Sequence, residues 1–172
     1  MTQATKVKIV TGKVRFSYAN VFQPKASVEG GTPKYSVSII IPKSDKETIA
    51  KINKAFEETK AAAAAYFGGS VPKGLKGGLR DGDEEKDDPA YAGSYFINAN
   101  SAQKPGVVDA DLNPILDINE FYSGCYGRAS ITFYPYNAQG SKGIACGLNN
   151  VQKLEDGEKL GGATSAAADF AV

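Results

Sequence analysis

The side chains best suited to chemistry in this sequence are aromatic and cationic, and they alternate with small residues over positions 121–137. Tyr126 and Arg128 occupy one set of alternate positions, whereas small apolar residues such as Cys125 and Ala129 occupy the other. A period of two is typical of a strand with one buried face. The second face needs another explanation, and aromatic rings beside a cation are suited to stacking bases and neutralising phosphates. The pattern therefore predicts a surface for single-stranded nucleic acid.

The residue types that most catalytic and metal sites require are missing. The sequence has no histidine, which excludes His-based triads and the usual zinc sets. Its two cysteines, Cys125 and Cys146, lie on the predicted apolar faces of neighbouring strands and are interpreted as buried free thiols. The acidic run at 81–88 has Lys86 where a calcium loop needs glycine, so we interpret it as a solvated loop. We expect no enzymatic activity, no metal and no cofactor.

Charge is distributed unevenly along the chain, although the formal net charge is only +1. Residues 1–43 hold seven Lys or Arg and one acid, whereas residues 80–89 hold six acids and two bases. Such segregation matters more than the total charge for what a surface attracts. The sequence has no apolar run near the roughly 20 residues that a membrane span requires, and residues 1–10 lack the apolar core of a signal peptide. We expect no membrane association and a cytoplasmic location.

The elements that must position these side chains are mainly strands. Alternating segments predict strands at 12–18, 34–41 and 91–100, then a hairpin over 104–118 and the long strand pair at 121–150. These strands, joined without long crossovers and rich in glycine where they must bend, fit an antiparallel OB-fold barrel. Another β-rich sandwich is the alternative architecture.

One amphipathic helix is inserted between the second and third predicted strands. Ser44 is its predicted N-cap, with Glu47 three residues on as in a capping box, and Gly68-Gly69 ends it. We assign residues 1–154 to the OB-fold domain and residues 155–172, which lose the apolar pattern, to a flexible C-terminal tail.

Cations on the outward strand faces, and the aromatic residues near them, are the candidate contacts to nucleic acid. The cations would neutralise phosphates and release counterions, and the rings would stack on bases. For each ring, packing in the core is the alternative explanation. The candidate residues are Lys13, Arg15, Lys25, Lys34, Phe96, Lys104, Tyr122, Tyr126 and Arg128.

Seven segments, in order, resemble the small single-stranded DNA-binding proteins of tailed phages. The segments read GKVRFSYANVFQPK, PKYSVSIIIPKSD, LRDGDEE, YAGSYFINA, KPGVVD, EFYSGCYGRASITFYPYN and KGIACGLNNVQK, and the resemblance covers nearly all of residues 12–162. The resemblance implies an OB-fold that coats single-stranded DNA without sequence preference during phage replication or recombination in a bacterial host. It is also compatible with self-association of the protein on DNA.

Proteins of the resembled family commonly end in a flexible acidic tail that contacts other replication proteins. This sequence departs from that pattern, because Asp169 is the only acid after Gly161. Asp169 and Phe170 are the candidate contacts to phage or host replication and recombination proteins. Mild competition between the tail and DNA for the same cations is the role that the weak tail charge favours.

Two other functions fit parts of the sequence. A structural or decoration protein of the virion would also be β-rich and lack histidine, but it would not need basic strand faces. A metal-dependent nuclease could use the acids of the 81–88 loop, although those acids come from one loop instead of converging from several elements. Salt-dependent binding of oligo-dT and magnesium-dependent cleavage are the assays that separate the three.

Overall fold

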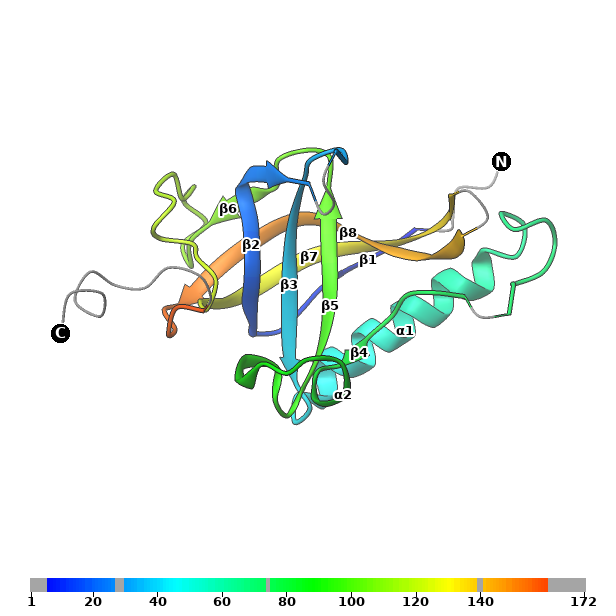
Figure 1. The fold of residues 1–172 in the computed structure, drawn as a ribbon, viewed down its shortest axis with the longest axis horizontal. Coiled ribbons are helices and arrows are strands. Elements are labelled where there is room, and N and C mark those ends of the chain that lie inside the picture. Colours follow the sequence, from blue (N-terminus) through cyan, green and yellow to red (C-terminus); the bar gives the residue numbers. More distant parts are fainter. Residues whose placement is uncertain (1–5, 27–29, 74, 139–140, 161–172) are drawn as a thin grey trace.

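The computed structural model describes residues 6–26, 30–73, 75–138 and 141–160. Strands β2, β3 and β5 are crossed by the long β7–β8 hairpin, and one long helix, α1, lies beside them (Figure 1). Among the described residues no helix is long and apolar enough to cross a membrane. The elements are β1 (Val7–Val10), β2 (Val14–Lys25), β3 (Lys34–Pro42), α1 (Lys46–Ala62), β4 (Arg80–Asp81), α2 (Gly82–Glu85), the 3-10 turn η1 (Pro89–Tyr91), β5 (Ser94–Ser101), β6 (Gly106–Val108), β7 (Tyr126–Ala138) and β8 (Ser141–Glu155).

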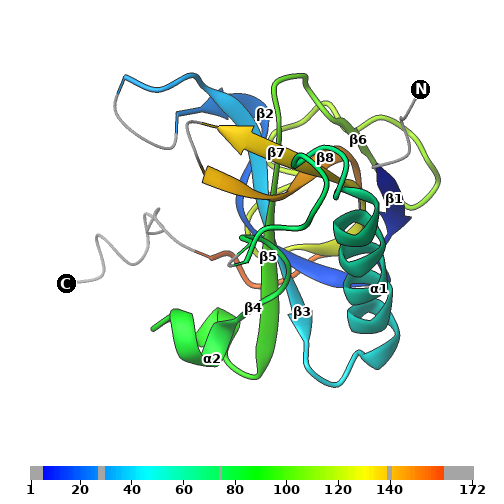
Figure 2. The same ribbon diagram turned by 90° about the vertical axis from the view of Figure 1, so that its right-hand side faces the viewer.

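Strand pairing closes a ring in the order β2-β3-β5-β8-β7 and back to β2. Figure 2 shows β7 and β8 crossing the sheet of β2, β3 and β5. The ring closes through short contacts: β2 and β7 share two residue pairs, and β5 meets β8 at the pair Asn100 and Gly147. This arrangement is that expected of an OB-fold. Two strand contacts depart from the predicted antiparallel pairing, because β8 runs parallel to both β5 and β6.

The inside of the ring is filled by the residues that the alternating patterns predicted to face inward. On β7 the run from Ala129 through Ile131 to Phe133 is buried at alternate positions, and Phe16 and Ile39 join the same core from β2 and β3. Burial of such side chains is the main favourable term in folding. The predicted inward face is therefore confirmed for these strands.

Both cysteines are free and buried, as predicted. Burial raises the pKa of the Cys146 thiol to about 12, and burial likewise raises the pKa of Cys125. Neither sulfur is a thiolate at neutral pH, so neither is a reactive nucleophile.

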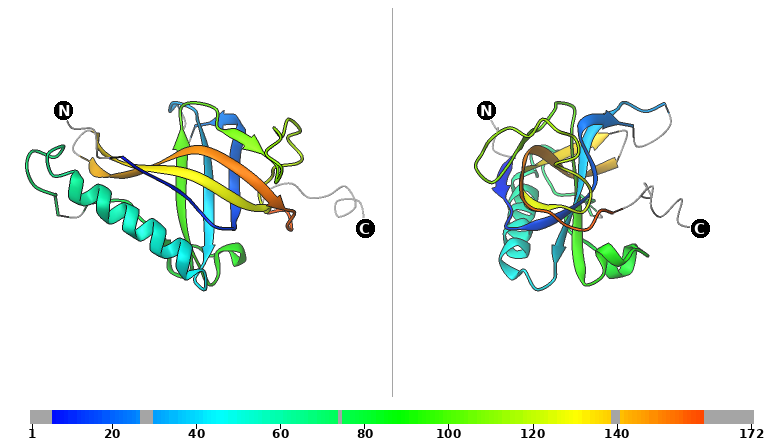
Figure 3. Two further views of the ribbon diagram at one scale, coloured as in Figure 1. Left: turned by 180° about the vertical axis from the view of Figure 1, so that it is seen from behind. Right: turned by 90° about the vertical axis from the view of Figure 1, so that its left-hand side faces the viewer.

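Helix α1 lies alongside β1 and β7 (Figure 3), with Ile52 and Ala55 buried against the core. The predicted N-cap was wrong by one residue: the Asp45 carboxylate, not Ser44, accepts a hydrogen bond of 3.1 Å from the Thr48 amide. An aspartate satisfies this orphan N–H as well as a serine does. The helix ends at Ala62, ahead of the predicted glycine pair. In the structure α1 follows β3, which is the third strand and not the second, because the sequence pattern did not predict β1.

The predicted hairpin within residues 104–118, all of which the structure describes, is reduced to a single antiparallel bridge across the predicted turn. β6 instead pairs parallel with β8, and Val108 makes an isolated antiparallel bridge to Pro114. A proline has no N–H to donate to a ladder, so a second strand starting at Pro114 is disfavoured.

A second, smaller core covers part of the outer face of β3 and β5. Ile40 and Phe96 point outward there and are sealed by Tyr91, whose ring lies edge-on to Phe96 with centroids 5.1 Å apart. The Tyr91 hydroxyl donates to Ser38 Oγ at 2.9 Å. Phe96 has 0% of its surface exposed. The prediction that Phe96 stacks on bases is wrong for this structure, because the segment that follows β4 covers its ring.

Acids of the 81–88 run hold this covering segment in place. Lys43 Nζ lies 2.9 Å from carboxylate oxygens of both Asp81 and Asp83. A hydrogen bond from the Gly93 amide, together with Lys43, lowers the pKa of Asp83. Most acids of the run remain exposed, as predicted for a solvated loop, but Asp81 and Asp83 also hold the covering segment through Lys43. In the described part of the chain no group of three or more acidic or cysteine side chains could hold a metal ion.

We expect Phe96→Ala to lower the free energy of unfolding by about 3–5 kcal/mol, as for a fully buried phenylalanine. Chemical denaturation measures this loss directly. Affinity for oligo-dT, corrected for the folded fraction, should stay unchanged because the ring is closed off from any ligand. A variant that is stable but binds weakly would return Phe96 to the nucleic-acid surface.

Candidate nucleic-acid interface

A groove of about 480 Å³ lies between β5 and the β8 residues that come before the Asn100–Gly147 pair. We call it the β5–β8 groove. It lies on the part of the β3–β5 outer face that the second core leaves open, beside the β7–β8 hairpin. Its lining combines apolar residues with two tyrosines, two asparagines and two cations. The lining residues are Lys34, Gly77, Gly78, Arg80, Ile97, Asn98, Asn100, Tyr134, Tyr136, Ile144, Ala145 and Cys146.

The groove combines the two features that single-stranded nucleic acid needs. Tyr134 and Tyr136 are half-buried on alternate positions of β7, so part of each side chain stays accessible in the groove. Lys34 at the end of β3 and Arg80 on β4 provide positive charge. The Arg80 guanidinium is oriented by Glu85, at 2.6 Å, and lies 5.1 Å from the Phe96 ring centroid. OB-folds bind oligonucleotides on this face and on the loops next to it.

Three of the predicted cations lie at the end of the sheet, in the groove or beside it. Lys34 lines the groove itself, and Lys25 is its register partner across the β2–β3 pair. Lys104 places its Nζ 5.5 Å from the ring centroid of Phe22 on β2. These three positions form a basic edge from which phosphates could be reached.

A second group of predicted residues gathers where β2 begins beside the start of β7. We call Lys13, Arg15, Tyr122 and Tyr126 the β2–β7 patch. The Tyr126 ring centroid is 5.5 Å from Lys13 Nζ and 5.4 Å from Arg15 Cζ, so both cations lie near one aromatic ring. This pairing of a ring with cations is the arrangement that the sequence predicted, but it is not part of the groove.

Residues 155–160 lie across the β2–β7 patch. Glu155 pairs with Lys13, and the Glu158 carbonyl accepts a hydrogen bond of 2.7 Å from Arg15 Nη2. Tyr122 Oη donates to Asp156 Oδ1 at 3.1 Å. Hydrogen bonds from Lys153 and Tyr122 lower the pKa of Asp156, which keeps it ionised at neutral pH. The first residues of the predicted tail therefore lie against the domain, and the rest of that tail, 161–172, lies outside the described residues.

Arg128 is exposed but already bound. Its Nε and Nη2 donate to the side-chain oxygen of Gln152 at 2.8 and 2.6 Å, and Gln152 in turn donates to the Asp109 and Ala110 carbonyls. The outward placement expected from the strand pattern is correct. A phosphate contact by Arg128 stays a prediction.

The groove residues that the sequence did not single out are Arg80, Asn98, Asn100, Tyr134 and Tyr136. Both tyrosines continue the outward set that contains Tyr126, so the alternation could have found them. No sequence pattern marked Arg80 as a binding residue, because its segment has no periodicity and the run beside it is acidic. The predicted tail residues Asp169 and Phe170 lie outside the described residues.

We expect Tyr122→Phe to tighten binding to a short oligo-dT roughly 2–10-fold at low salt. The change keeps the ring but removes the hydroxyl that holds residues 156 and 157, so the patch cations become easier to reach. A fluorescence titration measures the effect, with the exposed Tyr66→Phe as the matched control. Equal affinity of both variants and the unmodified protein would show that the segment does not limit access.

Known proteins match this chain over nearly its whole length. The family described as "Enterobacter phage Enc34, ssDNA-binding protein" matches residues 7–172. "Putative protein p50" of Acyrthosiphon pisum secondary endosymbiont phage 1 is 28% identical over 172 residues, which cover 95% of this chain and 92% of that protein.

Solved structures agree with this match. The single-stranded DNA-binding protein from bacteriophage Enc34 in complex with ssDNA superposes with a TM-score of 0.72 and 26% identity, covering 92% of this chain and 91% of that one. The single-stranded DNA binding protein gp2.5 of bacteriophage T7 has a TM-score of 0.65 at 18% identity, covering 96% and 94%, and shows likeness of fold alone. The chain thus belongs to the phage single-stranded DNA-binding protein family of Enc34, a family of binding proteins and not of enzymes.

Proposed function

We propose that this protein coats single-stranded DNA without sequence preference during phage DNA replication or recombination, and that the strand lies in the β5–β8 groove. The observation that carries the proposal is the pairing of two tyrosine rings with cations over one open groove. Stacking and phosphate neutralisation tolerate any base, because every base has a π-face and every nucleotide a phosphate. The family relative from Enc34 was solved in complex with ssDNA, which supports the same ligand class here.

When residues 156–160 move off the β2–β7 patch, the patch becomes available as an extension of the path of the DNA strand. In the structure these residues satisfy Arg15 and Tyr122 with their own carbonyl and carboxylate oxygens, which are the groups that a DNA backbone would replace. Competition of this kind depends on charge and weakens with salt. It also keeps the exposed cations from binding other polyanions.

Protein partners and location are part of the proposal. Asp169 and Phe170 would contact replication or recombination proteins of the phage or the host, and copies of the chain would self-associate on DNA. The protein would act in the cytoplasm of the bacterial host. Family membership favours this function over a virion structural protein or a metal-dependent nuclease.

Salt dependence tests the cationic contacts. We expect Lys34→Ala to reduce the slope of log K against log salt by about 0.7, because one phosphate contact to a single strand is lost. Arg15→Ala should do the same if the patch joins the path. Lys54→Ala on the exposed face of α1, where Lys54 pairs with Glu58, is the matched control and should leave the slope unchanged. A slope that Lys34→Ala does not alter removes this residue from the site.

Stacking is tested by removing rings one at a time. We expect Tyr134→Ala to weaken binding to a short oligo-dT by about 1–3 kcal/mol with little change in salt slope, since a ring displaces no counterion. Tyr126→Ala reports on the patch in the same assay, and Tyr66→Ala is the control. Thermal melts give the folded fraction. The groove is excluded as the stacking site if Tyr134→Ala and the control bind alike.

A further inference from the structure

One end of the molecule carries an acidic and apolar loop, residues 109–120, which we call the acidic end. It contains four Asp or Glu and no Lys or Arg. Leu112, Leu116 and Ile118 are 68%, 85% and 63% exposed. Three exposed large aliphatic side chains so close in the sequence mark an interaction surface. The acids around them repel the phosphates of DNA, so the partner is a protein.

Hydrogen bonds donated by backbone amides hold the acidic end in a fixed shape. Asp109 Oδ1 accepts from the amides of Asp111 and Asn113, both at 2.9 Å. The Ile115 amide donates to the Val107 carbonyl at 2.8 Å. Leu112 is held with a φ of +69°, a left-handed conformation that few residues other than glycine adopt. Because the loop is already ordered, binding through it loses little conformational entropy.

The opposite end of the molecule has the complementary chemistry. Residues 59–73, which include the end of α1 and the chain after it and which we call the basic end, contain two Lys and no Asp or Glu, and Lys60 pairs with Glu57 of the preceding helical turn at 3.9 Å. Tyr66 is 51% exposed there and lies edge-on to Phe67 with ring centroids 5.2 Å apart. Lys73 is also exposed. An aromatic and basic surface of this kind matches an aliphatic and acidic one in both polarity and charge.

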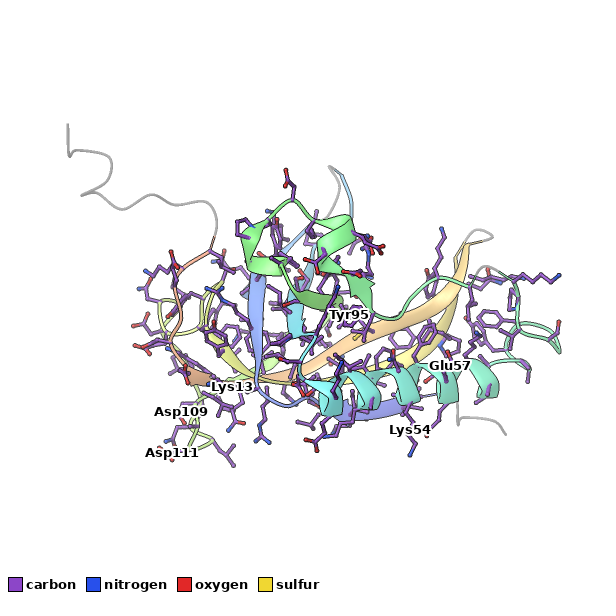
Figure 4. The ribbon with its side chains drawn as sticks, turned by 90° about the horizontal axis from the view of Figure 1, so that it is seen from below. Lys13, Lys54, Glu57, Tyr95, Asp109 and Asp111 are labelled. Carbon is purple, nitrogen blue, oxygen red and sulfur yellow. The ribbon has the colours of Figure 1, made fainter. Side chains whose placement is uncertain are left out.

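The two ends lie at opposite extremes of the longest axis (Figure 1). Figure 4 shows the same separation, with Asp109 and Asp111 at one end and α1, marked by Lys54 and Glu57, reaching toward the other. Two different surfaces cannot form a symmetric dimer through one contact. A head-to-tail contact between them repeats from copy to copy and produces a row.

We propose that the acidic end of one copy binds the basic end of the next, so that the protein lines up head to tail along single-stranded DNA. The inference rests on the proposed function, because the strand supplies the alignment. A weak contact suffices, since copies bound to one strand have a high effective concentration for each other. The occupant of the acidic end is thus a second copy of this chain.

Charge reversal tests the contact on oligo-dT of two lengths, one that holds a single copy and one that holds several. We expect Asp111→Lys and Lys73→Glu each to lower affinity roughly 10-fold on the long strand. Neither should weaken binding to the short strand. The double variant should recover long-strand affinity, because each contact then again joins one acid to one base, with the two charges exchanged between the ends. Asp87→Lys, an exposed reversal outside both ends, is the matched control.

Cross-linking tests the geometry. Leu116→Cys and Tyr66→Cys variants, mixed on a long oligo-dT under mild oxidation, should form a disulfide-linked dimer. Neither variant should do so alone, and the native cysteines are buried and free. A dimer from Leu116→Cys alone would show a symmetric contact and overturn the proposal, as would failure of the double charge variant to recover.

Comparing the two oligo-dT lengths also distinguishes a failure of the head-to-tail contact from a failure of DNA binding itself. If the unmodified protein does not bind the short strand, DNA binding itself is wrong. If it binds the short strand, but binds the long strand with the same affinity per copy, only the head-to-tail contact is wrong.

Discussion

The pairing of β7 with β8 is the constraint on which the other features of the structure depend. This hairpin closes the ring by reaching β2 on one side and β5 on the other, and it carries β1 and β6 at its edges. Close approach at Gly127 makes the pairing specific, because an added Cβ would lie 1.8 Å from the Gln152 carbonyl oxygen. Neither an alanine nor any larger side chain fits there without moving the backbone.

The same hairpin also creates the groove. β8 contacts β5 at the Asn100–Gly147 pair, and the β8 residues that come before this pair, 144–146, line the groove together with Tyr134 and Tyr136 of β7. On the other half of the β3–β5 face, the segment from Asp81 to Tyr91 fills the equivalent space, buries Phe96 and is held by the ion pairs of Lys43. One outer face therefore has a covered half that stabilises the fold and an open half that is available for a ligand.

The sequence by itself determined which side chains fill the barrel and that the fold is mainly β. Alternation placed Phe16, Ile39 and Ile131 in the core, because a strand has only two faces and water excludes apolar side chains from one of them. The absence of histidine and the family resemblance pointed to binding instead of catalysis. Local pattern also placed the N-cap of the helix to within one residue, but its predicted stop at Gly68-Gly69 lies beyond the observed end at Ala62.

Only the tertiary structure decided which outward aromatic residues remain accessible. Alternation assigns a residue to a face but says nothing of another segment that covers that face. Tyr91 hides Phe96, and residues 155–160 lie over Tyr126, so in both cases the cover comes from outside the strand that it covers. Tyr134 stays accessible where it lines the β5–β8 groove. The residue types of the candidate site, cations beside aromatic rings, could be predicted from the sequence. The position of the site could not, because it depends on contacts between segments that no local pattern encodes.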